Sequence, residues 1–443
     1  MNVGSERKWL SILERNSITG LNISHLFFGY EFDDQIDDGI MEGISSTIPL
    51  SVTHLSFGNR FNRSIDNLPS TITHLTLGAA FDKPIDGLPN SLIYLRIENN
   101  YLKGGQFSPR EMFNQPINHL PPSLEYLHLG DNFNHRIDGL ASLTNLKELI
   151  LGGKFNEEVM NLPSSLKILK LGRSFNRVVT TLPPYLSTLK LGLAFNQPLD
   201  KLPSSLKNLT TGDAFDGDID SLPHGLLRLK LGNTFNKPIS KLPSTLIKIT
   251  FGRDFNQPID LLPSSISDIE FGARFNQPID KLSPNVTRLV LGHKFDQELD
   301  GLQQSLRILS MDNCYHYDKP LNNLPNSIEV LKLGSGFKTR IKSYPSSLKS
   351  IHFGDHYNHP IDNLPNGLIY LSLGGGFDQE LEGLPPSLRY LVLQERDTYP
   401  TYDFPDSLEV VIISNEWDTR TRINRSIDLK FPPEIKKGIG IST

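Results

Sequence analysis

The sequence has a single cysteine, only two tryptophans and a net charge of −5 over 443 residues. One thiol, Cys314, cannot build an intramolecular disulfide, which excludes a disulfide-framework protein. Because 44 Lys and Arg nearly balance 49 Asp and Glu, the chain is not a disordered tail of one charge sign. No apolar run approaches the ~20 residues that span a bilayer, and residues 1–16 lack a signal-peptide core. We therefore expect a soluble, cytoplasmic protein that binds no membrane.

Phenylalanine, glycine and proline are abundant, with 24, 34 and 31 copies, although only 37% of the residues are apolar. The length alone suggests about three domains, but these residues recur in register, most often every 20 positions. Such self-similarity is typical of a repeat array, whose length measures the number of repeats. Segment 188–207, TLKLGLAFNQPLDKLPSSLK, illustrates the unit. Its glycine recurs at Gly58, Gly78, Gly130, Gly152, Gly172, Gly192, Gly212, Gly232, Gly252, Gly272, Gly292, Gly334, Gly354 and Gly374.

An aromatic residue stands three positions after each of these glycines, and Asn or Asp usually follows it. The complete unit reads L-x-x-L-x-L-G-x-x-F-N-x-P-I-D-x-L-P-x-S. It resembles the FNIP repeat, a short relative of the leucine-rich repeat known from social amoebae and from giant viruses that infect amoebae. The resemblance covers about residues 50–393, and FNQPID occurs verbatim at 255–260 and 275–280. The aromatic column comprises Phe61, Phe81, Phe113, Phe133, Phe155, Phe175, Phe195, Phe215, Phe235, Phe255, Phe275, Phe295, Tyr317, Phe337, Tyr357 and Phe377.

The alternation in L-x-L predicts a short strand whose leucines face inward and whose intervening residues face outward. About 15 residues remain for a turn and a return, enough for the crossover that parallel pairing requires. The sequence therefore predicts a mainly β, leucine-rich-repeat-like solenoid, close to flat, with about 17–19 coils and one short parallel strand per repeat. Turns or short 3-10 pieces are expected on the opposite side, where Pro cannot donate to a ladder.

The other columns of the repeat also have physical roles. Gly marks a bend where a side chain would clash or φ must be positive. Phe is expected to stack in the interior on the Phe of the next coil, and Asn to bond from coil to coil. The Asp after Ile is expected to begin the return turn as an Asx or N-cap residue, with calcium binding as the alternative. This column is Asp66, Asp86, Asp138, Asp200, Asp220, Asp260, Asp280, Asp300 and Asp362.

The chain divides into three segments at the sequence level. Residues 1–49 are expected to form an N-terminal cap with a degenerate repeat, 50–393 the solenoid, and 394–443 degenerate repeats with a C-terminal cap or tail. A glycine-containing insertion at about 99–112 is expected to form a loop. Viral relatives often carry an F-box, but no segment here shows the apolar helical pattern of ~40–50 residues that this module needs.

Candidate catalytic and metal-binding residues lack the partners that such chemistry needs. His352, His356 and His359 share one coil but fall on different sides of it, so we do not predict a zinc site. Cys314 has no nucleophile motif around it, and the periodic glycines match no phosphate-binding motif. We expect no enzymatic activity, no cofactor and no small-molecule substrate. The alternative from another class is a hydrolase formed by the insertion.

The outward strand positions form the candidate binding surface. Tyrosines occupy neighbouring coils near each end, and basic residues gather in the middle of a chain that is acidic overall. Tyr and Arg are enriched in protein interfaces, whereas the net charge argues against nucleic acid. His54 and His74 share an outward position in adjacent coils, which suggests pH-sensitive binding. The predicted binding residues are Tyr94, Tyr126, Lys170, Lys190, Arg228, Lys230, Lys248, Tyr370 and Tyr390.

The expected function is a non-enzymatic protein–protein interaction module or scaffold that docks a partner with acidic patches on its strand face. A merely solvated face, polar for solubility, is the alternative explanation of the same residues. The family resemblance implies a further role, recruiting substrates to a host ubiquitin ligase through a separate adaptor, in the host cytoplasm if the protein is viral. The remaining alternative is a structural protein that stacks end to end, which exposed final strands would favour.

Overall fold

The computed structural model describes residues 22–29, 48–98, 112–394 and 404–414. The chain divides into two compact units, Met1–Leu226 and Leu227–Thr443, called unit 1 and unit 2 below. Strands of three to five residues dominate both units, and η2 (Asp138–Ser142) is a 3-10 helix in unit 1. The strands of unit 1 are β1 (His25–Phe27), β2 (His54–Ser56), β3 (His74–Leu77), β4 (Tyr94–Ile97), β5 (Tyr126–Leu129), β6 (Glu148–Leu151), β7 (Ile168–Lys170), β8 (Thr188–Lys190) and β9 (Asn208–Thr210).

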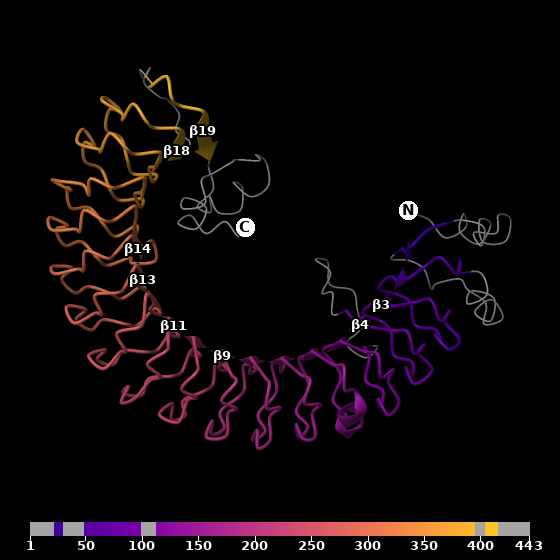
Figure 1. Ribbon diagram of the computed structural model, residues 1–443. Helices are drawn as coiled ribbons and strands as arrows, with labels where there is room; N and C mark the ends of the chain where they lie inside the picture. Colours follow the sequence, from indigo (N-terminus) through magenta and orange to yellow (C-terminus); the bar gives the residue numbers. More distant parts are fainter. Residues whose placement is uncertain (1–21, 30–47, 99–111, 395–403, 415–443) are drawn as a thin grey trace. The chain divides into compact units, whose positions relative to one another are not determined.

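Each unit is a parallel β-solenoid with one strand per coil. Consecutive strands pair in parallel and in register, so that Leu169 lies beside Leu189 and Leu189 beside Leu209. Figure 1 shows the strands of each unit along one side of the ribbon and the turns along the other. The predicted fold class is thereby confirmed. The strands of unit 2 are β10 (Arg228–Lys230), β11 (Lys248–Thr250), β12 (Asp268–Glu270), β13 (Arg288–Val290), β14 (Ile308–Met311), β15 (Val330–Leu333), β16 (Ser350–His352), β17 (Tyr370–Ser372), β18 (Tyr390–Gln394) and β19 (Val410–Ser414).

The core of each unit is built from the inward leucines and the aromatic column. Leu166, Leu169 and Leu171 of one coil are all buried. Phe175 is completely buried, and its ring centroid lies 6.1 Å from that of Phe155 and 6.0 Å from that of Phe195. The ring planes of these pairs are within 9° and 3° of parallel. The predicted phenylalanine stack is therefore present, and each buried ring contributes roughly 2–3 kcal/mol of gross transfer free energy.

Ring spacing shows that the coils splay apart away from the strands. Paired strands lie ~4.8 Å apart, whereas the Phe255 and Phe275 ring centroids are 6.1 Å apart. In unit 1 the same spacing is 6.0 to 6.3 Å from Phe61 to Phe215. Each unit therefore curves with its strands on the concave side. The expectation of a nearly flat solenoid was wrong, because a phenylalanine ring occupies more room along the axis than one strand.

The recurring bend after each strand requires glycine because of close packing between coils. A Cβ atom on Gly172 would overlap the carbonyl oxygen of Gly152 in the preceding coil, and one on Gly192 would overlap the carbonyl oxygen of Gly172. Neither Gly172 nor Gly192 is among the residues with positive φ. Glycine is therefore needed at these two positions because a side chain would clash, and not because φ is positive. The bend itself is a tight turn in which Phe195 N–H donates to Gly192 O at 3.1 Å.

The asparagine column bonds from coil to coil, as predicted. Asn156 Oδ1 accepts a hydrogen bond from the backbone N–H of Asn176 at 2.9 Å, and Asn176 Oδ1 accepts one from Asn196 N–H at 2.9 Å. The glutamine of FNQ reinforces this ladder, since Gln197 Nε2 donates to Asn176 Oδ1 at 3.1 Å. These bonds satisfy backbone donors that lie beyond the end of the strand ladder. The FNQ motif is thus explained by folding alone.

The L-P-x-S segment forms the turn that returns the chain to the next strand. Leu206 N–H donates to Pro203 O at 3.1 Å, which closes the turn. Ser205 Oγ donates to the carbonyl oxygen of Leu186 in the preceding coil at 2.7 Å. The serine column is therefore a second inter-coil ladder, which the repeat pattern alone did not predict. A hydroxyl with a fixed carbonyl acceptor explains why Ser or Thr recurs at this place.

The aspartate column does not act as a uniform turn cap. Asp138 is the first residue of η2, whose N-cap position is Ile137 without a side-chain cap bond. Asp86 Oδ1 instead accepts a hydrogen bond from His119 N–H in the next coil at 3.0 Å. Asp260 lies 3.3 Å from Lys281 Nζ of the next coil. The N-cap prediction was therefore wrong at Asp138, whereas Asp86 and Asp260 join neighbouring coils.

Strands continue past both ends of the segment 50–393. Strand β1 pairs with β2 and β18 pairs with β19, so a coil of this kind lies on each side of that segment. The three segment boundaries themselves stay a prediction. Residues 1–21 of the predicted N-terminal cap, residues 99–111 of the insertion and residues 415–443 of the predicted C-terminal cap or tail lie outside the described residues.

Candidate partner-docking surface

An aromatic ladder runs across the outward side of β1 to β5 in unit 1. The ring centroids of His25 and His54 are 4.1 Å apart, and those of His54 and His74 are 4.0 Å apart. The stack continues from His74 to Tyr94 at 5.6 Å and from Tyr94 to Tyr126 at 4.3 Å. We call these five residues the aromatic ladder. It contains both predicted tyrosines of this unit and the predicted histidine pair.

His25 extends the predicted histidine pair to three rings. The 20-residue period does not predict it, because 29 positions separate His25 from His54. A shared tripeptide marks all three strands, since Ser24 or a threonine precedes each His and a leucine follows it. This tripeptide could have identified the third ring.

The hydroxyl before each histidine holds the ring. Ser24 Oγ lies 2.8 Å from His25 Nδ1, and Thr53 Oγ1 and Thr73 Oγ1 each lie 2.9 Å from the Nδ1 of the following histidine. Each Nδ1 is therefore engaged, and Nε2 is the remaining polar atom of every ring. The register pairing of the strands then aligns the three Nε2 atoms along one edge of the ladder.

The electrostatics of the ladder favour the neutral form of His54 and His74. Burial lowers the pKa of His54 below 6.5, and the neighbouring His74 and His25 lower it further. Burial and His25 likewise lower the pKa of His74. In the adjacent outward column, burial and the nearby Arg96 lower the pKa of His128 to about 4. Burial therefore favours the uncharged form of His54, His74 and His128, and the neighbouring imidazole or guanidinium groups add to this effect.

Two of the five predicted basic residues, Lys170 and Lys248, form ion pairs with carboxylates on neighbouring strands. Lys170 Nζ donates to Glu148 Oε1 at 2.8 Å. Lys190 is the register partner of Lys170 and is exposed. The first part of this cluster is therefore one Glu148–Lys170 ion pair with the exposed Lys190 beside it, and not a bare basic patch.

In unit 2 the cluster forms a charge network across β11 to β13. Asp268 accepts from Lys248 Nζ at 2.9 Å and from Arg288 NH1 at 2.8 Å. Arg228 and Lys230 of β10 are exposed, and Arg228 is the register partner of Lys248. Partly exposed ion pairs of this kind contribute little to stability, but they fix the positions of charges that a partner would meet.

Tyr370 and Tyr390 are not available as exposed anchors. They are register partners on β17 and β18, as predicted, but they are only 4% and 3% exposed. Both rings belong to an apolar cluster on this side of the sheet. The reason is that the outward positions become apolar at the end of the array, so the tyrosines pack instead of facing water. The neighbouring apolar side chains are Val392, Ile369, Val410 and Ile412.

The histidines and the cysteine considered for metal binding or catalysis do not converge. Within the described residues, no group of three or more His, Cys, Asp or Glu side chains is arranged to hold a metal ion. His352 Nδ1 instead lies 2.8 Å from Ser372 Oγ, and His359 packs against the edge of Tyr357. Cys314 is buried and donates from Sγ to Gly292 O at 3.1 Å, and burial raises its pKa to about 12.

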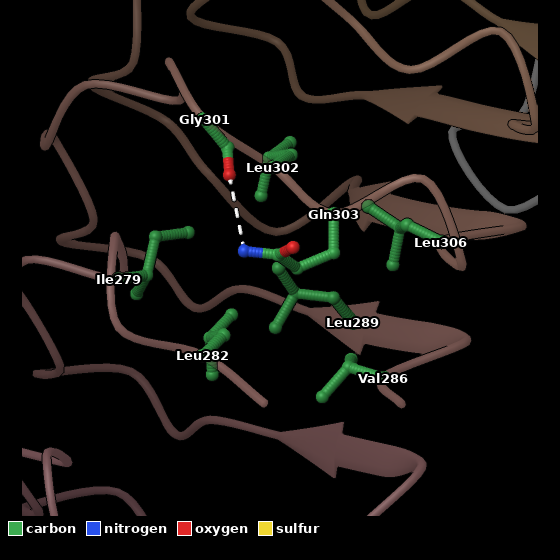
Figure 2. A pocket seen from close by; sticks show the side chains of 8 residues that line it. All are labelled: Ile279, Leu282, Val286, Leu289, Gly301, Leu302, Gln303 and Leu306. Carbon is green, nitrogen blue, oxygen red and sulfur yellow. Dashed lines mark hydrogen bonds between the residues drawn. The ribbon is translucent and has the colours of Figure 1, made fainter. Parts of the chain in front are cut away.

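Figure 2 shows a small apolar cavity between two coils on the turn side of unit 2. Its volume is about 10 Å³, which is room for at most one water molecule. Gln303 stands here in place of the usual proline, and its Nε2 donates to Gly301 O at 3.5 Å. The cavity is a local packing defect and not a ligand site. Its lining consists of Ile279, Leu282, Val286, Leu289, Gly301, Leu302, Gln303 and Leu306.

The strand-and-turn architecture and its concave sheet define a leucine-rich-repeat-like solenoid, a fold typical of protein-interaction modules. The chain belongs to the FNIP Repeat family, whose profile matches more than half of it. Where the structure describes the chain, no helix has both the length and the apolar character needed to cross a membrane. The family matches cover residues 42–78, 64–100, 113–140, 195–234, 217–254, 235–274, 255–283, 317–356, 338–376 and 357–396.

Three solved structures resemble the chain. CroV588, described as a circular leucine-rich-repeat protein and coming from a giant virus, is 35% identical with a TM-score of 0.70. The match covers 89% of this chain and 60% of CroV588, so the chain spans less than two thirds of that protein. YopM from Yersinia enterocolitica is 20% identical over 87% of this chain and 97% of its own, with a TM-score of 0.48.

The third is the Toll–Spatzle complex of Drosophila, 13% identical over 84% of this chain and 57% of that chain, with a TM-score of 0.48. A comparison with curated proteins finds no match.

Proposed function

We propose that the protein is a non-enzymatic interaction module that docks a partner protein on its strand face, with the aromatic ladder of unit 1 as the anchor. The observation that carries the proposal is the stack of five half-buried or exposed rings on β1 to β5. A solvated face kept polar only for solubility does not need adjacent aromatic rings. Aromatic residues with a polar edge are the side chains that most often anchor protein interfaces.

The ladder is also rigid, which favours binding. Each ring stacks on at least one neighbouring ring, and a hydroxyl holds each histidine. Little side-chain entropy is then lost when a partner docks. The concave curvature supports the same role, because a concave sheet brings outward side chains of successive coils toward one partner. The match to CroV588, a leucine-rich-repeat protein, agrees with this use of the fold.

The test compares two tyrosine sites in unit 1. The variant Tyr94→Ala with Tyr126→Ala removes both tyrosines of the ladder. The matched control is Tyr185→Ala, because Tyr185 is 69% exposed but lies in the turn before β8, away from the strands of the aromatic ladder. Affinity capture from the native cell, read by mass spectrometry, should recover a partner with wild type and with the control but not with the ladder variant. Equal recovery with all three proteins would exclude docking on the ladder.

A second candidate function, end-to-end stacking, is favoured by the last described strand. Val411 and Ile413 of β19 pair with buried Leu391 and Leu393, yet they are 41% and 51% exposed. Core positions that face water at a strand edge favour the addition of another strand. Light scattering over a range of concentrations should then show association of wild type that Ile413→Lys abolishes. A monomer at every concentration would eliminate this candidate.

Recruitment of substrates to a ubiquitin ligase stays a prediction from the family resemblance. No described residue tests it.

A further inference from the structure

The outward positions of β1 to β5 carry no carboxylate. Besides the aromatic ladder they contain one permanent charge, Arg96 of β4, and His128 of β5. The first acid near this surface, Glu98, follows β4 and lies 3.6 Å from Arg96 Nε. Among the described residues, the titratable groups that stack on the three ladder histidines are therefore one another and Tyr94 on the next strand. Below the pKa of tyrosine, any charge that these rings gain is positive.

We infer that the histidines of the aromatic ladder bind an acidic segment of the partner protein, and that His54 and His74 take up protons as they do so. This inference rests on the proposed function and deepens it. Without a partner, His54 and His74 resist protonation, because both rings are partly buried and each lies 4.0 to 4.1 Å from a neighbouring imidazole that would repel a second charge. Carboxylates placed along the Nε2 edge remove this repulsion and gain charge-assisted hydrogen bonds.

The hydroxyls beside the rings are arranged to accept this change of charge. Thr53 Oγ1 can donate to Ser24 O at 3.3 Å, and Thr73 Oγ1 can donate to Thr53 O at 3.2 Å. Each threonine oxygen is then able to accept a hydrogen bond from the Nδ1–H of its histidine. A doubly protonated ring therefore has an acceptor for Nδ1–H within the protein. Its Nε2–H is left for a carboxylate of the partner, and the proton comes from solvent.

The regular spacing indicates the form of the acidic segment. The three rings lie on consecutive strands, so their Nε2 atoms repeat in a line that crosses the sheet. An extended chain with closely spaced acidic side chains matches such a line better than a single carboxylate does. Aspartate is the suitable probe, because its unperturbed pKa of ~3.9 keeps it charged where histidine titrates.

The experiment measures binding of a fluorescent oligoaspartate of about ten residues to the full chain, between about pH 7.5 and pH 6 at constant ionic strength. If one proton is taken up on binding, the affinity should rise about tenfold for each unit by which the pH falls. The double variant His54→Gln with His74→Gln should lose this rise. The matched control His119→Gln, at an exposed turn-side histidine of unit 1, should keep it.

Calorimetry at about pH 6.5 in buffers of different ionisation enthalpy gives a second readout that does not depend on stability at low pH. Wild type should take up about one proton or more on binding, and the double variant close to none. Equal proton uptake by both proteins, or a tighter pH-dependent complex with single-stranded DNA than with oligoaspartate, would overturn the inference. If wild type shows no pH effect with oligoaspartate but still captures a partner through Tyr94 and Tyr126, the inference about the histidines is wrong and the docking function stands.

Discussion

The clearest energetic prediction concerns a single oxygen atom in the aromatic column of unit 2. Tyr317 occupies a position where most coils have Phe, and its ring lies 6.2 Å from Phe295 and 6.4 Å from Phe337. Its hydroxyl is buried and has no hydrogen-bond partner among the described residues. Burying a hydroxyl without a partner costs ~1–3 kcal/mol. Tyr317→Phe removes that cost and should therefore stabilise the protein.

The expected gain is about 1 kcal/mol, because the small void left by the oxygen offsets part of the relief. Tyr357→Phe is the matched control two coils away. Tyr357 is equally buried, but its hydroxyl lies 3.5 Å from that of Tyr344. The same change there leaves Tyr344 without this contact and should cost about 1 kcal/mol.

Urea unfolding followed by circular dichroism measures both effects. The midpoint should rise for Tyr317→Phe and fall for Tyr357→Phe. A fall of equal size for both variants would show that the Tyr317 hydroxyl has a partner, and the reasoning would be wrong.

Three further outcomes are expected. Gly172→Ala should strongly lower the free energy of unfolding measured in urea, because its Cβ would overlap a carbonyl oxygen of the preceding coil. Gly367→Ala is the control and should be nearly neutral, because the space around Gly367 is open. Gln303→Pro should raise stability by about 0.4–1 kcal/mol, because proline makes the same turn in neighbouring coils; a lower unfolding midpoint would contradict this. Stability of wild type should fall as the pH drops below ~6.5, because the lowered pKa values of His54 and His74 mean that the unfolded chain binds protons more readily. Replacing both histidines with glutamine should flatten this pH profile, and an unchanged profile would refute the cause.

The fold could be predicted from the sequence because its columns depend on local chemistry. A period of 20, an alternating L-x-L and a buried aromatic give the strand, the core and the bend in nearly every coil. The hydrogen bond from Asn196 N–H to Asn176 Oδ1 could also be predicted, because an asparagine recurs at the same position of successive repeats. The curvature did not follow, since it depends on the difference between the ring spacing and the strand spacing, and no single repeat shows that difference.

The candidate site was only partly predictable, because neighbours across the sheet decide what each outward residue does. Tyr94 and Tyr126 form the predicted aromatic pair. Lys170 is outward as predicted, but Glu148 on the preceding strand neutralises it. Tyr370 is outward as well, yet apolar neighbours bury it. Periodicity identifies the side of the sheet on which a residue lies, whereas its exposure and net charge depend on residues one coil away.

The most direct test of docking on the strand face is the dissociation constant of the captured partner, measured by calorimetry with purified proteins. Tyr94→Ala with Tyr126→Ala should weaken binding by about 30-fold or more, the effect of losing an aromatic anchor of ~2 kcal/mol. Tyr185→Ala, at an exposed tyrosine in a turn, should leave the constant unchanged. Equal affinities for wild type and the ladder variant, or an equal loss with Tyr185→Ala, would contradict the account.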